Sequence, residues 1–188
     1  RLSDKQEVAR SKQFPFRFTN ALDVTHQFSD SKLQSALSKA VDASLGNLPQ
    51  LGNNVWIIID CSGSMGGTPI KTACLFAAAL LKANAEADNV KVTMFSDDAT
   101  HVSANTNDSV LSIADVFTRK VKGGGTNLAA ALREKDNLGF DPDTVVVLSD
   151  MQINSLDVTG SKVYYNNKPS TQPVNVAQVF NKNTVKVA

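Results

Sequence analysis

The sequence predicts an α/β domain with a mostly parallel central sheet, helices on both faces of the sheet, and an N-terminal helical segment. The run at residues 55–59 is continuously apolar and rich in β-branched residues, and Thr144 to Leu148 is a second valine-rich run; both are typical of strands buried in a sheet. Segments with apolar residues at helical spacing lie between the predicted strands. Strands that alternate with helices favour a parallel sheet, and 188 residues are enough for one such domain.

We expect residues 1–50 to form a helical segment that precedes a domain spanning residues 51–188. An aromatic stretch surrounds Pro15, which marks a turn or a helix start. Asp30 or Ser31 can cap the helix that follows. The apolar positions of that helix have helical spacing: Leu33, Leu37, Ala40, Val41 and Leu45.

The elements of the domain proper are expected to alternate regularly. The strand at 55–59 precedes a long helix that Pro69 opens and that runs to about Asp88. The later elements are expected in this order: a strand at 90–95, an edge strand at 100–103, a helix at 109–120, a glycine-rich loop at 123–126, a helix at 127–139, a strand at 144–148, a polar, turn-rich stretch at 154–172, a helix at 174–180 and a strand at 184–188. Asp60 and Asp150 follow predicted strands, and ligands bind such sheets at the carboxyl ends of strands.

The composition gives no support to several classes of protein. The formal net charge of +1 gives no general reason to expect nucleic acid or a membrane as a partner. No apolar run approaches the roughly 18 residues needed to span a bilayer. We expect no disulfide between Cys61 and Cys74, and two thiols in a chain of this length suit a reducing compartment. The chain starts at Arg1 without a signal-peptide pattern, so we expect a piece of a longer cytoplasmic protein.

Three polar segments carry the candidate functional residues, and each follows a predicted strand or precedes a predicted helix. The candidate metal ligands are two carboxylates and three hydroxyls: Asp60, Ser62, Ser64, Thr126 and Asp150. The spacing of the first three lets side chains of one loop turn towards one point, and the glycines at 123–125 let a second loop approach closely. Hard cations prefer such oxygen donors, so the sequence predicts a Mg²⁺ site, with Mn²⁺ or Ca²⁺ as alternatives.

Each segment has an ordinary structural interpretation when it is taken alone. Asp60 with its serines, or Asp150, would then be a cap, and three glycines would be a flexible turn. Only the combination favours a metal site. Zinc and copper fit poorly, since no cluster of His and Cys has ligand spacing. Because two carboxylates leave a bound Mg²⁺ about neutral, a carboxylate from a protein partner can occupy an open coordination position.

The three segments resemble the metal-ion-dependent adhesion site of von Willebrand factor A (vWA) domains, over roughly residues 53–188. The resemblance rests on Asp60-Cys61-Ser62-Gly63-Ser64 after an apolar strand, on Gly124-Gly125-Thr126, and on Ser149-Asp150 after another strand. It implies a Rossmann-like vWA fold, and it implies that the domain functions by binding a ligand. It also implies that Ser62 and Ser64 are direct metal ligands. Asp60 and Thr126 would bind the metal directly or through water, and Asp150 through water.

A second resemblance begins in the N-terminal segment. The stretch Arg10–Leu22, the amphipathic helix at 31–45 and the later Phe95-Ser96-Asp97 are similar to the end of the TROVE module and the vWA domain of Ro RNA-binding proteins. Proteins of that family bind small noncoding RNAs and the ends of misfolded RNAs through a ring of helical repeats. The resemblance implies that this ring lies mostly before Arg1, so that RNA is bound through the parent protein.

Two binding functions are compatible with these residues. One is a protein-interaction module, unrelated to RNA, that captures a partner carboxylate through the metal. The other is an RNA-binding component to which Lys5, Arg10, Lys12 and Arg17 contribute positive charge. Four such residues more often form a solvated surface than an RNA site. The sequence leaves the oligomeric state open.

Three enzymatic alternatives fit less well. Gly63-Ser64-Met65-Gly66 lacks the full nucleophile elbow of serine hydrolases, and His26 and His101 are expected to be solvated or structural. The glycine and lysine pattern of a phosphate-binding loop is absent. A phosphotransfer aspartate at position 60 would need a second acid two residues later, where Ser62 stands. We therefore expect no catalytic activity.

Overall fold

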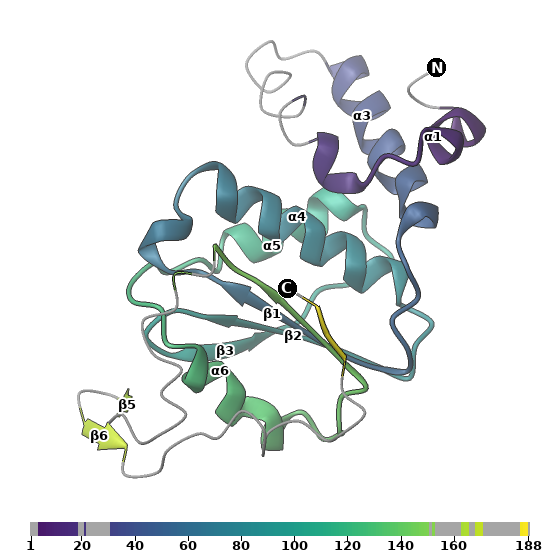
Figure 1. Ribbon diagram of the computed structural model, residues 1–188. Helices are drawn as coiled ribbons and strands as arrows, with labels where there is room; N and C mark the ends of the chain where they lie inside the picture. Colours follow the sequence, from purple (N-terminus) through teal and green to yellow (C-terminus); the bar gives the residue numbers. More distant parts are fainter. Residues whose placement is uncertain are drawn as a thin grey trace.

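A computed structural model describes residues 4–18, 21, 31–150, 152, 163–165, 168–170 and 185–187. The strands are β1 (Asn54–Asp60), β2 (Asn89–Phe95), β3 (Ala99–Val102), β4 (Thr144–Leu148), β5 (Val163–Tyr165), β6 (Lys168–Ser170) and β7 (Val185–Val187). The helices are α1 (Lys5–Ser11), α3 (Ser31–Ala43), α4 (Thr68–Ala83), α5 (Val110–Thr118) and α6 (Leu128–Arg133), with the 3₁₀ turns η1 (Pro15–Phe18), η2 (Ser44–Asn47), η3 (Gly63–Met65) and η4 (Glu134–Asn137). Figure 1 shows their arrangement.

The central sheet has five strands in the order β3-β2-β1-β4-β7. β2 and β4 flank β1 in parallel orientation, β7 is parallel to β4, and β3 runs antiparallel to β2 at the edge. The chain leaves β1 for β2 on one side and later reaches β4 on the other side of β1. The carboxyl end of β1 is therefore the switch point at which such sheets bind ligands. The predicted α/β fold with a mostly parallel sheet is confirmed.

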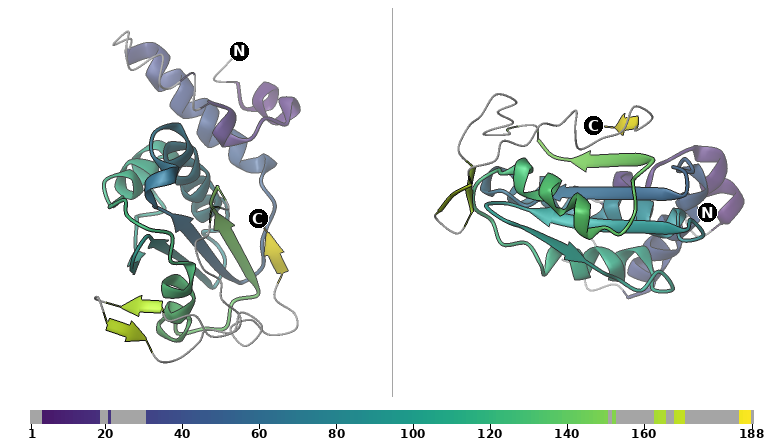
Figure 2. Two further views of the ribbon diagram at one scale, coloured as in Figure 1. Left: turned by 60° about the vertical axis from the view of Figure 1, so that its left-hand side comes forward. Right: turned by 90° about the horizontal axis from the view of Figure 1, so that it is seen from below.

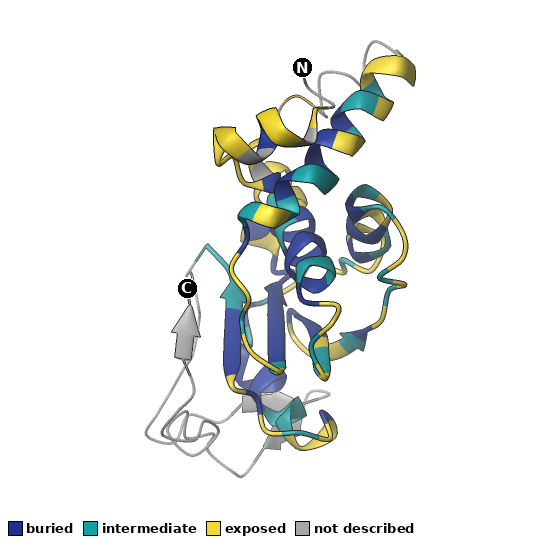
Figure 3. Ribbon diagram, turned by 90° about the vertical axis from the view of Figure 1, so that its right-hand side faces the viewer, coloured by how far each residue is buried: buried dark blue, intermediate teal, exposed yellow. Residues whose placement is uncertain are grey.

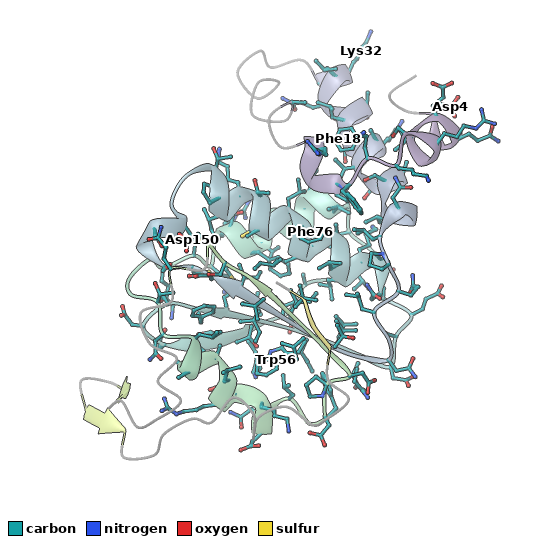
Figure 4. The ribbon with its side chains drawn as sticks, in the orientation of Figure 1. Asp4, Phe18, Lys32, Trp56, Phe76 and Asp150 are labelled. Atoms are coloured by element: carbon teal, nitrogen blue, oxygen red, sulfur yellow. The ribbon has the colours of Figure 1, made fainter. Side chains whose placement is uncertain are left out.

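The side chains of β1 alternate between two apolar clusters, one on each face of the sheet. Ile57 and Ile59 pack into a cluster with α4 and α5. Trp56 and Ile58 belong to the cluster on the opposite face, which α6 covers. Figure 2 shows the helical layers on the two faces, and Figure 4 shows Phe76 of α4 and Trp56 on opposite sides of the sheet. The apolar run of β1 is thus buried on both faces, as its composition predicts.

The N-terminal helical segment shares the apolar cluster of the α4 face. Leu37 and Val41 of α3, together with Leu48, are buried in the same cluster as the inner residues of α4 and α5. A hydrogen bond joins the two parts as well, because the amide of Val110 at the start of α5 donates to Asp42 Oδ1 over 3.1 Å. Figure 3 shows this buried layer beneath an exposed outer surface of the segment. The segment therefore packs on the α/β domain as part of one core.

The predicted long helix is shorter than its apolar pattern indicates. It ends at Ala83 instead of near Asp88. The side chain of Asn84 donates to Leu80 O over 2.9 Å and accepts a hydrogen bond from Leu51 N, also over 2.9 Å. This buried amide ends the helix because it satisfies a helical carbonyl and a loop amide at the same point.

Other predicted elements differ in detail. The helix predicted over 127–139 consists of α6 followed by the 3₁₀ turn η4. The polar stretch at 154–172 contains the hairpin of β5 and β6, which the sequence did not indicate. The predicted helix at 174–180 lies outside the described residues. Within the described part of the chain, no helix has both the length and the apolar character needed to cross a bilayer.

Candidate metal centre

The carboxyl ends of β1 and β4 bring Asp60 and Ser149 together. Ile59 pairs with Leu148 in the register of the two strands, so the next residue of each strand lies at the same edge of the sheet. Ser149 Oγ donates a hydrogen bond to Asp60 Oδ2 over 2.6 Å. Asp60 is fully buried, with an exposed fraction of 0%. The strand pairing thus places the carboxylate at the switch point and orients one of its oxygens.

The loop after β1 folds back over the other oxygen of this carboxylate. The amide of Ser62 donates to Asp60 Oδ1 over 2.9 Å. The hydroxyls of Ser62 and Ser64 lie 3.1 Å apart, within hydrogen-bonding distance. The short turn η3 begins at Gly63 and places Ser64 on the exposed side of the loop, while Ser62 is buried. The spacing of these three residues therefore brings their side chains to one place, as the sequence predicts.

The glycine loop lies directly against this first loop. The amide of Gly63 donates to Gly124 O over 2.9 Å, and the amide of Asn127 donates to Ser96 O over 2.7 Å. Thr126, between these two contacts, is buried with an exposed fraction of 6%. Asn127 also caps α6, since its side chain accepts from the amide of Ala130. The loop that carries Thr126 is thus fixed at both ends.

Asp150 is half-buried at the same edge of the sheet. It directly follows Ser149, and its Oδ1 accepts a hydrogen bond from the amide of Gln152 over 3.1 Å. Met65, at the end of the first loop, and Asp150 line one cleft. Figure 4 shows Asp150 beside the turn that leads from β1 into α4. The structure therefore brings all three predicted segments to the carboxyl ends of β1, β2 and β4.

The electrostatics of the site centre on the buried Asp60 carboxylate. It receives neutral donors, the amide of Ser62 and the hydroxyl of Ser149, and within the described residues no lysine or arginine pairs with it. Burial, together with the nearby Cys74 and Asp60, raises the pKa of the neighbouring Cys61 thiol to about 12. Burial likewise raises the pKa of Cys74 to about 11. Both cysteines are free and buried.

These residues fit a hard divalent cation. A buried carboxylate is costly unless a positive charge compensates it. A cation held by Asp60 and the hydroxyls of Ser62 and Ser64 would supply that charge, with Thr126 and Asp150 as the remaining oxygen donors. The set contains oxygen donors alone, which suits Mg²⁺ better than zinc or copper.

Comparison with known families bears directly on this arrangement. A family model of the von Willebrand factor type A domain matches residues 55–152, which is more than half of the chain. The chain belongs to the von Willebrand factor type A family. The matched range of this vWA domain contains the ends of β1 and β4 and the glycine loop.

The crystal structure of the Deinococcus radiodurans RO (RSR) protein is similar to the vWA chain, with a TM-score of 0.60 and 18% sequence identity. The similarity covers 81% of this chain and 34% of that protein, so the chain spans about a third of its length. Residues 55–188 are less than three quarters of the chain, so the shared fold includes part of the N-terminal segment. No curated protein sequence matches the chain.

The four basic residues considered for RNA binding lie elsewhere on the vWA chain. Lys5 belongs to α1, Arg10 and Lys12 are exposed at its end, and Arg17 is exposed on η1. These elements pack on α3 and α4, away from the strand ends that carry Asp60 (Figure 1). The structure therefore does not bring these cations to the predicted metal ligands.

His101 is hydrogen-bonded within the fold. His101 lies on β3, where Nδ1 is 2.8 Å from Thr93 Oγ1, and Trp56 Nε1 donates to the same oxygen over 2.8 Å. His101 Nε2 lies 3.5 Å from a carboxylate oxygen of Glu134. These contacts give His101 a structural role between the edge strand and η4. His26 lies outside the described residues.

Ser149 and Asp97 belong to the site, although the sequence motif indicates no role for either. Ser149 is part of the third segment, but its hydrogen bond to Asp60 depends on strand register. Asp97 follows β2 closely and accepts a hydrogen bond from the amide of Gly125 over 3.1 Å. The available signal was the same for both residues, namely a polar side chain just past the end of a buried strand.

Proposed function

We propose that this vWA domain binds a protein partner through a Mg²⁺ ion held by Asp60, Ser62, Ser64, Thr126 and Asp150. The observation that carries the proposal is the buried Asp60 carboxylate at the switch point, hydrogen-bonded to Ser62 and Ser149 and without a cationic partner among the described residues. When bound, Mg²⁺ supplies a Lewis-acidic position at which a partner carboxylate can replace water.

Each residue has a distinct part in this proposal. Asp60 contributes the buried charge, and Ser62 and Ser64 contribute hydroxyl oxygens from the same loop. Thr126 adds a hydroxyl from the glycine loop, and Asp150 completes the charge balance from the end of β4. Two carboxylates against one divalent ion leave no net charge, so the ion keeps its affinity for an incoming carboxylate. The proposed activity is binding and includes no catalytic step.

Calorimetric titration with Mg²⁺ tests the metal site. We expect the wild-type chain to bind one ion, Asp60→Ala to abolish binding, and Thr126→Ala to weaken binding by less. Asp136→Ala is the matched control, because it removes an exposed carboxylate of η4 and should leave the affinity unchanged. Circular dichroism verifies that each variant is folded. Unchanged affinity in Asp60→Ala would contradict the assignment.

A second candidate function is that of an RNA-binding, Ro-like ribonucleoprotein component with cytoplasmic location. Its support is the fold shared with the RO protein, which includes part of the N-terminal segment, together with the sequence resemblance in residues 10–22 and 31–45. In this proposal the parent protein binds small noncoding or misfolded RNA, and the basic residues of α1 and η1 add positive charge beside it. The vWA domain would then present its metal site to a protein partner of the complex.

Fluorescence anisotropy with a labelled small structured RNA separates the two candidates. Affinity that falls steeply between about 50 and 200 mM salt would support RNA binding, because phosphate contacts release counterions. The double variant Arg10→Ala, Lys12→Ala should then lose affinity, and Lys91→Ala, Lys120→Ala should not. A Mg²⁺-dependent protein partner with no measurable RNA affinity, also in the full-length protein, would favour the protein-interaction module.

A further inference from the structure

Asp97 contacts the glycine loop at two points. It lies just past the end of β2, and its Oδ1 accepts a hydrogen bond from the amide of Gly125 over 3.1 Å. Its backbone carbonyl accepts from the side-chain amide of Asn127 over 3.1 Å. These two partners stand on either side of Thr126. Asp97 therefore holds the backbone that flanks one proposed metal ligand.

The shape of the glycine loop follows the Asp97 carboxyl group closely. A methyl group added at Gly125 would come within 2.7 Å of Asp97 Oδ1, and the other atom within 4 Å would be the Asp97 Cγ. Gly124 has a φ of +111°, and a side chain there would collide with Asp97 Oδ2. Both glycines thus permit a contact that any larger residue would prevent. The two absent side chains make room for one carboxylate.

The contact extends from Asp97 to the loop after β1, which carries Ser62 and Ser64. Gly124 O accepts the amide of Gly63, which lies between Ser62 and Ser64. A shift of the glycine loop would therefore move Thr126 and also disturb the loop that carries the two serines. Two hydrogen bonds, from Gly125 N to Asp97 Oδ1 and from Gly63 N to Gly124 O, therefore link Asp97 to the loop after β1.

We propose that Asp97 is the positioning residue of the metal site: its carboxylate fixes the glycine loop so that Thr126 stands ready for the ion. This inference rests on the proposed Mg²⁺ function and extends it to a residue outside the five ligands. Asp97 acts through the amide of Gly125, so the accepting oxygen matters and the negative charge does not.

Three variants separate position from charge. Asp97→Ala removes the acceptor, and we expect Mg²⁺ affinity to fall by about ten-fold or more, as is usual for residues that orient metal ligands. Asp97→Asn keeps an accepting oxygen and should retain near wild-type affinity. Asp98→Ala removes the neighbouring charge, whose carboxylate pairs with exposed Lys122 at 3.9 Å, and should have no effect. Equal losses in Asp97→Asn and Asp97→Ala would overturn the positioning role.

A double-mutant cycle tests the close contact directly. Gly125→Ala alone should reduce Mg²⁺ affinity, because its methyl group collides with the Asp97 carboxylate. In the Asp97→Ala background the same methyl group has space, so the second substitution should cost little more. If the losses of Mg²⁺ affinity in the two single variants add up in the double variant, the Asp97 carboxylate does not determine the conformation of the glycine loop.

Amide hydrogen exchange without metal distinguishes failure of this inference from failure of the proposed function. The Gly125 amide should exchange at least ten-fold faster in Asp97→Ala than in the wild-type chain or in Asp97→Asn. If the wild-type chain binds no Mg²⁺, the proposed function fails, and this exchange still decides whether Asp97 holds the loop. If Mg²⁺ binds equally in wild type and Asp97→Ala, the metal site stands and the positioning role is wrong.

Discussion

Ser149 Oγ donates a 2.6 Å hydrogen bond to Asp60 Oδ2, and this contact joins the ends of β4 and β1. The two residues are 89 positions apart in the sequence and become neighbours through strand register. The bond occupies one oxygen of a carboxylate that has no access to solvent. Ser149 therefore donates to the buried carboxylate a hydrogen bond that water would supply at the surface.

Removal of this hydroxyl should destabilise the metal-free protein. Ser149→Ala leaves Asp60 Oδ2 without its donor, and hydrogen bonds to charged groups contribute roughly 1.5–3 kcal/mol to stability. Urea denaturation in the presence of a chelator measures the free energy of unfolding. Ser103→Ala, at an exposed serine, is the control and should change it by less than about 0.5 kcal/mol. A Ser149→Ala protein as stable as wild type would mean that the bond contributes nothing.

Asp60→Asn should separate stability from metal binding. Its amide can accept from Ser62 and donate to Ser149, so both contacts survive while the buried charge disappears. Because an uncompensated buried charge is costly, we expect the metal-free variant to melt at or above the wild-type temperature. Added Mg²⁺ should raise the melting temperature of wild type and leave that of the variant unchanged. A clear drop in melting temperature without metal would contradict this account.

The Thr93 hydroxyl, which accepts from Trp56 and is hydrogen-bonded to His101, should matter for the fold. Thr93→Val keeps the shape of a fully buried side chain but removes the oxygen that accepts from Trp56 Nε1. A buried donor without an acceptor costs about 1–3 kcal/mol, and urea denaturation should reveal a loss of that size. Thr93→Ser retains the oxygen and should lose less. The prediction fails if the serine variant is the less stable of the two.

The two thiols should resist alkylation in the folded state. Burial raises the pKa of Cys61 to about 12 and that of Cys74 to about 11, from an ordinary value of 9.0. The thiolate is the reactive form, so iodoacetamide at about pH 8 should label neither cysteine until urea is added. Rapid labelling of the native protein would show that these thiols are accessible.

The same shifts predict loss of stability at alkaline pH. The pKa of each thiol is higher in the folded than in the unfolded state, so the stabilisation is complete below pH 9.0 and declines as the pH rises towards about 11 and about 12. Urea denaturation across this range measures the decline, and Cys74→Ser should make it shallower. A decline of equal slope in that variant would assign the effect to other groups.

The sheet and its helices could be predicted because their signals are local. The continuous apolar runs of β1 and β4 identify buried strands, and the aspartate at or just after each run marks the edge of the sheet where a site can form. The end of α4 could not be predicted, because Asn84 depends on a hydrogen bond from Leu51, distant in the sequence. Propensity indicates a helix but not which tertiary contact ends it.

The candidate site likewise contains residues that could be predicted from the sequence and residues that could not. Asp60, Ser62 and Ser64 belong to one motif, and their convergence follows from a short loop. The parts contributed by Ser149 and Asp97 could not be predicted from the sequence, because they depend on the register of β1 with β4 and on the distance between two loops. Residues that bind a ligand often have characteristic spacing, whereas residues that support them are determined by packing.

The apolar cluster that joins α3 to α4 limits how this protein can be divided. Leu37, Val41 and Leu48 shield inner residues of α4 and α5 from water. A cut before residue 51 would bare that surface, and broad apolar patches promote aggregation. Because residues on both sides of the junction near residue 50 share this cluster, we expect the two parts to unfold together.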